Sequence, residues 1–210
     1  MNVTQRTKAL SITLLAAFTL AMLSGCASTR SYYAGAGFLA NCSNYKAANL
    51  FSGQEKHDSI GYTVFGRMDP GLRERVVFEA GYTRVGDTDF DGLYEGVEDQ
   101  GTIETEAIEV NVGYRYPFTD KFSAGGRIGA ARVDVSESEV FGGEPYSASA
   151  SETIAYGGLV ARYAFDRSWG VTAFYDYYPD VGKAGQTGEG NLHAFGVSFD
   201  YRFGGGNSDE

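Results

Sequence analysis

The segment that most constrains the fold is 193–203, where large apolar side chains occupy every second position. These positions are Phe195, Val197, Phe199, Tyr201 and Phe203. The residues between them are small, polar or charged, including Asp200 and Arg202. Successive side chains of a strand point to opposite faces, so one face of this segment is aromatic and the other is not. An apolar outer face with a small or charged inner face is typical of a transmembrane β-barrel.

The same alternation recurs along the chain before this last segment. We expect further strands at 31–43, 59–68, 73–84, 105–116, 122–134, 152–165 and 169–178. With 193–203 they number eight, and bacterial single-chain barrels have even strand numbers. The sequence therefore predicts an all-β protein, an eight-stranded antiparallel up-and-down transmembrane β-barrel.

The gaps between these strands fall into two length classes. The segments 69–71, 117–121 and 166–168 are short, and Asp69-Pro70-Gly71 has the residues of a tight turn. The gaps 44–58, 85–104, 135–151 and 179–192 are long. Short periplasmic turns and long extracellular loops are the arrangement of outer-membrane barrels. Tyr177 and Tyr178, at a strand end, are interpreted as part of the aromatic girdle at the membrane interface.

Composition agrees with strands rather than helices. The chain has 29 Gly, 15 Tyr and 14 Phe but only 4 Pro, which favours strands joined by tight turns. Charged residues make up 21%, because only half of each barrel strand needs to be apolar. The formal net charge of −10 argues against binding nucleic acid or anionic lipid through charge.

The first 25 residues have the pattern of a signal peptide. Arg6 and Lys8 precede an apolar run over 9–23, which is too short and wrongly flanked for a spanning helix. Leu23-Ser24-Gly25-Cys26 resembles a bacterial lipoprotein box, in which Cys26 would be lipidated; ordinary cleavage after Ala27 is the alternative. We expect the mature barrel at 31–203 and a flexible polar tail at 204–210.

Four strand segments resemble those of a known family. They are YYAGAG at 32–37, FEAGY at 78–82, VGYRY at 112–116 and FDYRF at 199–203. These segments are similar to strands of the OmpA-like and opacity-type outer-membrane β-barrels, and the resemblance covers 31–203. It implies a bacterial outer-membrane location and a structural or surface-interaction role, since members include anchors and adhesins.

The inner face of the predicted barrel carries both signs of charge. By alternation, the charged residues inside are Arg67, Glu79, Glu109, Arg115, Arg127, Arg162, Asp176, Asp200 and Arg202. An eight-stranded barrel is only wide enough for side chains to fill it. Unpaired buried charge is costly, so we expect these residues to pair and plug the lumen. A narrow gated pore is the alternative.

Catalytic motifs are weak in this sequence. Some barrels of this kind modify lipid A with His, Ser and an acid at the rim, but the only histidines are His57 and His193. Neither has a serine at a spacing that would activate its hydroxyl. We therefore expect no enzyme activity, and we keep a lipid A-modifying rim enzyme as an alternative. Recognition through extracellular loops, as in an adhesin, is the other alternative.

One loop matches a calcium-binding template. Residues 87–98 fit the pattern D-x-[DN]-x-[DN]-G-x₅-E of the EF-hand loop. The ligands would be Asp87, Asp89, Asp91, Leu93 through its carbonyl, Glu95 and Glu98. The flanks are strands rather than helices, so a weak Ca²⁺ site or a solvated acidic loop is expected. No other cofactor is expected, and the expected partners are outer-membrane lipid and a host or cell-surface ligand, with the chain a monomer.

Overall fold

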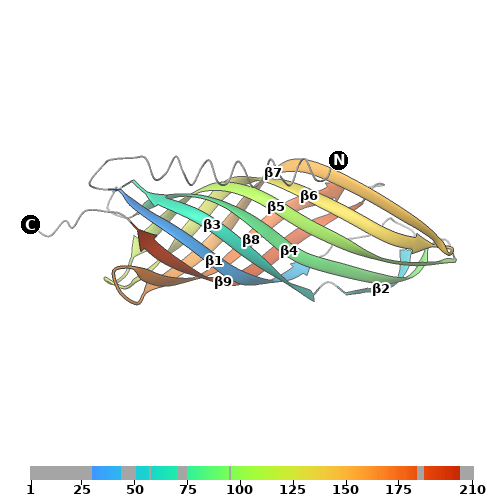
Figure 1. The fold of residues 1–210 in the computed structure, drawn as a ribbon, viewed down its shortest axis with the longest axis horizontal. Helices are drawn as coiled ribbons and strands as arrows, with labels where there is room; N and C mark the ends of the chain where they lie inside the picture. The colour runs from blue at the N-terminus through green and yellow to red at the C-terminus, as the bar shows by residue number, and fades with distance from the viewer. Residues whose placement is uncertain are drawn as a thin grey trace, which may run out of the picture.

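The computed structural model describes residues 30–43, 51–56, 58–70, 75–94, 96–183 and 187–203, and its elements are strands (Figure 1). They are β1 (Ser31–Ser43), β2 (Phe51–Lys56), β3 (Asp58–Asp69), β4 (Val76–Tyr94), β5 (Val97–Pro117), β6 (Phe122–Phe141), β7 (Glu144–Ala164), β8 (Trp169–Lys183) and β9 (Gly188–Phe203). The predicted signal peptide, Cys26 and the tail 204–210 lie outside the described residues. Within the described part of the chain, no helix is long and apolar enough to span a bilayer.

Eight of these strands form a closed antiparallel barrel. The order around the ring is β4-β3-β1-β9-β8-β7-β6-β5, and pairing of β4 with β5 closes it. The last strand closes against the first, with Tyr32 opposite Phe203. β2 pairs only with the outer part of β4 and lies outside the ring. The predicted eight-stranded up-and-down barrel is confirmed.

Short turns lie at one end of the barrel, which we call the turn end. The turn after β5 is held by the Thr119 hydroxyl, which accepts a hydrogen bond from the Phe122 N–H at 2.9 Å. The turn after β7 is held by Asp166, whose carboxylate accepts bonds from the N–H groups of Ser168 and Trp169. Such side-chain caps fix tight turns. The short turns predicted between these strands are therefore confirmed.

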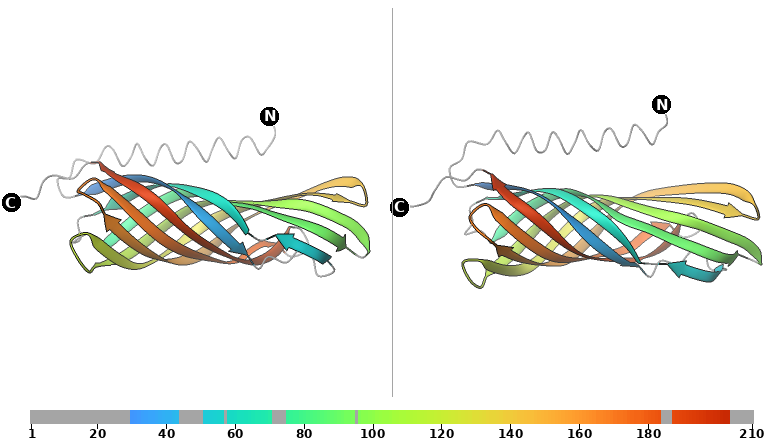
Figure 2. Two further views of the ribbon diagram at one scale, coloured as in Figure 1. Left: turned by 90° about the horizontal axis from the view of Figure 1, so that it is seen from below. Right: turned by 60° about the horizontal axis from the view of Figure 1, so that its bottom comes forward.

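The opposite end, which we call the hairpin end, differs from the prediction. Most of the segments expected as long loops at 85–104 and 135–151 are continuations of the strands, and β5 and β7 each have 21 residues. Figure 2 shows the β4–β5 and β6–β7 hairpins extending well past the rest of the barrel. Of the expected loop 179–192, residues 179–183 and 188–192 also belong to strands. A membrane needs only about 9–11 residues per strand, so the hairpins continue outside it.

The two faces of the barrel wall follow the predicted alternation. Large apolar side chains face outward, and Phe38 is 73% and Ile128 69% exposed. In the last strand, Phe195, Val197, Phe199 and Tyr201 are exposed, while Ser198 and Asp200 are buried. The exposed band is the surface that a bilayer would cover.

Two β-bulges change this alternation at the hairpin end, one in β4 and one in β8, where the register with β9 shifts between Tyr178 and Val181. In β4 the register shifts between Arg84 and Gly86, and Gly86 has a φ of 110°. Gly accepts this left-handed conformation without a steric penalty. Thr83 is buried before the bulge and Phe90 is buried after it, so the inward positions change from odd to even numbers. The bulge thereby directs the Asp87, Asp89 and Asp91 side chains outward.

The protruding part of β7 has a free edge. β7 pairs with β6 along its whole length, but its pairing with β8 ends at Gly157. Residues 144–156 therefore lack a ladder partner on that side within the described residues. β8 still contacts this segment through side chains: the Glu152 carboxylate accepts a hydrogen bond from the Gly182 N–H.

Candidate functional site: a closed lumen and a protruding acidic sheet

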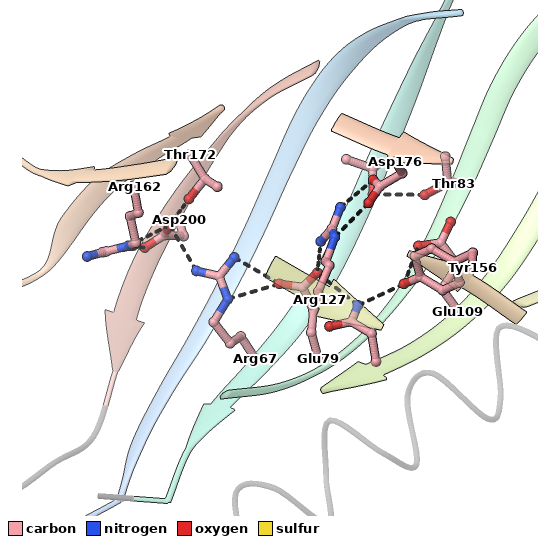
Figure 3. Close-up of polar contacts among 12 residues, drawn as sticks. Arg67, Glu79, Thr83, Glu109, Arg127, Tyr156, Arg162, Thr172, Asp176 and Asp200 are labelled. Atoms are coloured by element: carbon pink, nitrogen blue, oxygen red, sulfur yellow. Dashed lines mark hydrogen bonds and ion pairs between the residues drawn. The ribbon is translucent and has the colours of Figure 1, made fainter. Parts of the chain in front are cut away.

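A chain of alternating charges crosses the lumen, and we call it the lumen network (Figure 3). Its members, in contact order, are Asp176, Arg127, Glu79, Arg67, Asp200 and Arg162. They come from six different strands of the ring. All six were predicted to face the lumen, and their predicted pairing is confirmed.

Arg127 joins the first half of the lumen network. Its Nη1 lies 2.6 Å from Glu79 Oε1 and its Nε 2.8 Å from Asp176 Oδ1. A second guanidinium nitrogen also bonds the Asp176 carboxylate, so the pair is bidentate. Bidentate pairs fix orientation as well as charge. The Asn111 side chain adds a bond to Glu79 at 3.4 Å.

Arg67 and Arg162 form the second half. Arg67 Nη2 lies 2.8 Å from Glu79 Oε2, and its Nη1 lies 3.3 Å from Asp200 Oδ1. Arg162 Nη2 lies 2.6 Å from Asp200 Oδ2. Asp200 is fully buried and also accepts a bond from the Thr172 hydroxyl. Each buried carboxylate here has at least two cationic or hydroxyl partners, which offsets its desolvation.

Glu109 was predicted to pair with a cation and instead has two tyrosine partners. The Tyr178 hydroxyl donates to Glu109 Oε1 at 2.8 Å, and the Tyr156 hydroxyl donates to Oε2 at 3.2 Å. The two tyrosine rings stack with centroids 5.0 Å apart. Placing Tyr178 in the aromatic girdle was therefore wrong, whereas Tyr177 does face outward. Tyr178 has the same parity as the inward residue Asp176, which could have revealed its position.

Arg115 and Arg202 complete the predicted set without ion pairs. Both face the inside near the turn end, but neither lies within ion-pair distance of an acid among the described residues. Their predicted pairing was wrong, because the register brings the acids of the lumen opposite other arginines. Sequence alternation gives the face of a residue but not its neighbours two strands away.

A hydrophobic cluster fills the lumen toward the hairpin end, and the sequence analysis did not anticipate it. It includes Leu39, Val85, Phe90, Ile103, Val133, Val135, Val181 and Leu192, all nearly inaccessible to solvent. A cavity lined by members of the lumen network and by Glu109 and Tyr178 measures only about 10 Å³. A single water needs roughly that volume. Paired charge and apolar packing therefore close the lumen in two successive layers.

The residues of the calcium template lie in an extended hairpin. Asp87, Asp89, Asp91 and Leu93 belong to β4 and Glu98 to β5, while Glu95 lies outside the described residues. A strand rises about 3.3 Å per residue, so Asp87 and Asp91 are spread over about 13 Å. Asp89 accepts a bond from the Thr102 hydroxyl at 2.9 Å. Within the described residues, no three potential ligands are placed to hold a metal. Their predicted convergence was wrong, and calcium binding stays a prediction.

The protruding hairpins form a strongly acidic surface, which we call the acidic sheet and define as residues 85–106 and 132–156. The first range has eight acidic residues and no lysine or arginine; the second has five acidic residues and Arg132. Glu137 and Asp99 are buried on its inner face, and Asp99 Oδ1 has no hydrogen-bond partner. Burial, and after it the carboxylates of Glu139 and Asp99, raise the pKa of Glu137 to about 7.

Of the two histidines considered for catalysis, His193 is described. It lies on the outer wall, where its Nδ1 is 2.9 Å from the Tyr175 hydroxyl and its ring packs against Tyr177. Tyr175 and Tyr177 are aromatic residues of the neighbouring strand β8. This surrounding suits an aromatic girdle rather than a nucleophile and its base. The side chain of His57 lies outside the described residues.

Comparison with known sequences matches this architecture. A family model described as "Outer membrane protein beta-barrel domain" matches residues 10–203. Outer membrane protein A of Klebsiella aerogenes is 27% identical over 163 residues, which cover 75% of this chain and 43% of that protein. The chain thus spans less than half the length of that relative.

Comparison with solved structures gives the same fold. The crystal structure of Ail, the attachment invasion locus protein of Yersinia pestis, aligns with a TM-score of 0.54 at 14% identity. That alignment covers 82% of this chain and 98% of Ail. Ail in complex with the heparin analogue sucrose octasulfate aligns with a TM-score of 0.55 at 13% identity, covering 83% of this chain and 99% of that chain. At such identities the similarity concerns the fold.

Proposed function

Because this chain belongs to the outer membrane protein beta-barrel domain family, we propose that it binds a partner at the bacterial cell surface through its acidic sheet. It is an outer-membrane β-barrel protein with a structural or surface-interaction role. In this location the turn end faces the periplasm and the hairpin end faces the exterior. The closed lumen and the position of His193 favour this role over a gated pore or a lipid A-modifying enzyme.

The free edge of β7 carries the proposal. Within the described part of the chain, residues 144–156 have no ladder partner on the side of β8, and such an edge outside the membrane can accept an extended segment of another protein. Ser147, Ala148, Ser149, Ala150 and Ser151 are small, so an added strand could approach closely. Tyr146 is 56% exposed near the tip and offers an aromatic contact.

The charge of the acidic sheet selects the kind of partner. Ail has been crystallised with sucrose octasulfate, a sulfated heparin analogue. The acidic sheet of this chain would repel such a polyanion, since like charges across an interface are unfavourable. We therefore propose a basic, extended protein segment as the partner, rather than a sulfated polysaccharide.

Two matched double variants test this role. Ser147→Lys with Ser149→Lys places two lysines on the edge strand β7, where natural proteins use lysine to block strand addition. Ser138→Lys with Ser136→Lys places the same charges on β6, directly opposite the first pair in the ladder. Both variants change the charge of the same region equally, but only the first alters the free edge.

The measurement is adhesion of bacteria expressing each variant to cultured animal cells, with surface amounts equalised. We expect the β7 variant to lose most of its adhesion and the β6 variant to lose much less. Equal losses would indicate that charge alone is responsible. Wild-type adhesion no greater than that of bacteria without the protein would contradict the proposed role.

A further inference from the structure

The turn end of the lumen contains a second, separate cavity, which we call the mouth cavity. Its volume is about 660 Å³, and it is lined by inward residues of the barrel and by the turns 118–121 and 165–168. It lies beyond the lumen network, on the side of Arg162, which lines both. A cavity of this size falls within the range of small-molecule sites.

Among the described residues that line the mouth cavity, cations outnumber acids, although the whole chain has a net charge of −10. The cationic lining residues are Arg115, Lys121, Arg162, Arg167 and Arg202, and the acidic ones are Asp69, Asp120 and Asp166. Asp166 already caps the turn after β7 through two backbone N–H groups. The lining therefore has an excess of two positive charges.

Arg115 is a buried cation that lines the mouth cavity. Its exposed fraction is only 7%, yet its side chain has no ion pair or hydrogen bond to any other described residue. Arg115 lines the mouth cavity, and none of its side-chain nitrogens is among the fully buried atoms that lack a partner, so its donors retain accessible surface. A buried unpaired charge is costly, and an anion in the cavity would remove that cost.

Arg202 provides a second guanidinium in the same cavity. It follows the fully buried Asp200 by two residues on β9 and is partly buried. Its backbone N–H bonds the Ser168 carbonyl, which ties its position to the turn after β7. Its side chain has no acidic partner within the described residues. Because the two arginines lie on different strands, β5 and β9, they can donate hydrogen bonds to one oxyanion from two directions.

We propose that the mouth cavity binds a phosphate-bearing anion held by Arg115 and Arg202. A phosphate monoester carries about 1.5 to 2 negative charges at neutral pH, which matches the excess of positive charge in the lining. The guanidinium fork bonds two phosphate oxygens at once. The volume leaves room for a group attached to the phosphate. The source is either a soluble phosphate compound of the periplasm or a lipid headgroup of the inner leaflet.

Calorimetric titration of inorganic pyrophosphate tests the site. The full chain is refolded in a maltoside detergent, which carries no phosphate, and heat-dependent gel mobility verifies folding of each variant. We expect saturable binding to the wild type at low salt. Arg115→Gln and Arg202→Gln should each weaken binding about tenfold or more, since charged hydrogen bonds of this kind are lost. Arg115→Lys should recover part of the affinity by retaining the charge without the fork.

The control is Arg132→Gln, which removes an arginine from the hairpin end, where its side chain is 57% exposed. Its pyrophosphate affinity should stay within about twofold of the wild type, because its charge is exposed and remote. Absence of saturable heat in the wild type, or equal affinity in all variants, would overturn the proposal. These variants do not alter the free edge of β7, so the outcome is independent of adhesion.

A second titration distinguishes the two sources. The chain is placed in bilayer nanodiscs of phosphatidylcholine alone or with added phosphatidic acid. If phosphatidic acid lowers the apparent pyrophosphate affinity of the wild type, and Arg115→Gln abolishes this difference between the bilayers, a headgroup ligand is supported. Equal affinity in both bilayers supports a soluble phosphate compound.

Discussion

At the scale of single residues, glycines on the inner wall provide space for the lumen network. A Cβ atom at Gly158 would overlap the Asp176 carboxylate and the Tyr175 carbonyl oxygen. A Cβ at Gly170 would overlap the Arg162 guanidinium. The network thus depends on the residues that lack side chains as much as on those that carry charge.

Gly158→Ala should therefore destabilise the barrel. Overpacking of a filled interior costs about 1–3 kcal/mol, and here it displaces the Asp176 carboxylate from Arg127. Gly66→Ala is the matched control, because nothing lies within 4 Å of a Cβ at Gly66. Urea unfolding of the barrel in lipid vesicles measures both variants. A Gly158→Ala barrel as stable as Gly66→Ala would contradict this view of the network.

Sequence alternation could predict which residues face the lumen but not which ones meet. Arg67 and Asp200 are 133 residues apart and become partners because β1 closes the ring between β3 and β9. Arg115 and Glu109 also face the lumen, as the alternation predicts, yet neither forms an ion pair with a described residue. Partner choice depends on the relative stagger of the strands, which no local pattern encodes.

At the scale of elements, the hairpins were missed because polar residues dominate them. The segment 85–104 is acidic and glycine-rich, and such composition predicts a loop. Its side chains are water-exposed on one face, so no apolar stripe marks the strand. Pairing with β5, which in turn pairs with β6, keeps β4 extended. The bulge at Gly86 also broke the alternation that sequence analysis depended on.

The acidic inner face of the outer hairpin β6–β7, where Glu137 of β6 lies near Asp99 of the adjacent strand β5, should make the stability of this region depend on pH. The pKa of Glu137 is raised to about 7, above its ordinary value. Below its ordinary pKa, such a carboxyl is protonated in both the folded and the unfolded state, and it does not lower the free energy of unfolding. As pH rises above the ordinary pKa, the loss of folding stability grows, and it reaches its full size above a pH of about 7. The outer hairpin should therefore be less stable at pH 8 than at pH 4.5.

Glu137→Gln removes this loss of folding stability. At pH 8 it should stabilise the outer hairpin by about 1 kcal/mol, after allowance for solvent screening, and at pH 4.5 by much less. Amide hydrogen exchange of residues 97–105, compared between variant and wild type at each pH, measures the difference. Glu144→Gln, an exposed carboxylate of the next strand, is the control and should change little. A benefit independent of pH would contradict the assignment.

At the scale of the whole molecule, the lumen network and the hydrophobic cluster close the barrel to ions and water. The lumen network closes the half of the lumen toward the turn end with fixed charge, and the hydrophobic cluster excludes water from the half toward the hairpin end. An ion crossing the lumen would need both layers to separate at once. The sequence analysis predicted the first layer and not the second, because the second is built partly from residues assigned to loops.

The purified protein should therefore show no discrete conductance steps in planar bilayers at moderate voltage. A general porin with sixteen strands, whose lumen is a water-filled channel, serves as the positive control in the same bilayers. Reproducible steps from the wild type that disappear on heat denaturation would contradict the closed lumen.

The length of β7 has a consequence for where contact with another cell takes place. The thirteen residues 144–156 have no ladder partner on one side among the residues that the structure describes, and at about 3.3 Å per residue they run for roughly 43 Å. With the tilt of about 40° common in such barrels, the tip stands roughly 30 Å above the hydrocarbon boundary. That height is comparable with the thickness of the hydrocarbon core itself. The outer part of the free edge thus lies beyond the lipid headgroups, at a height where the surface of another cell can reach it.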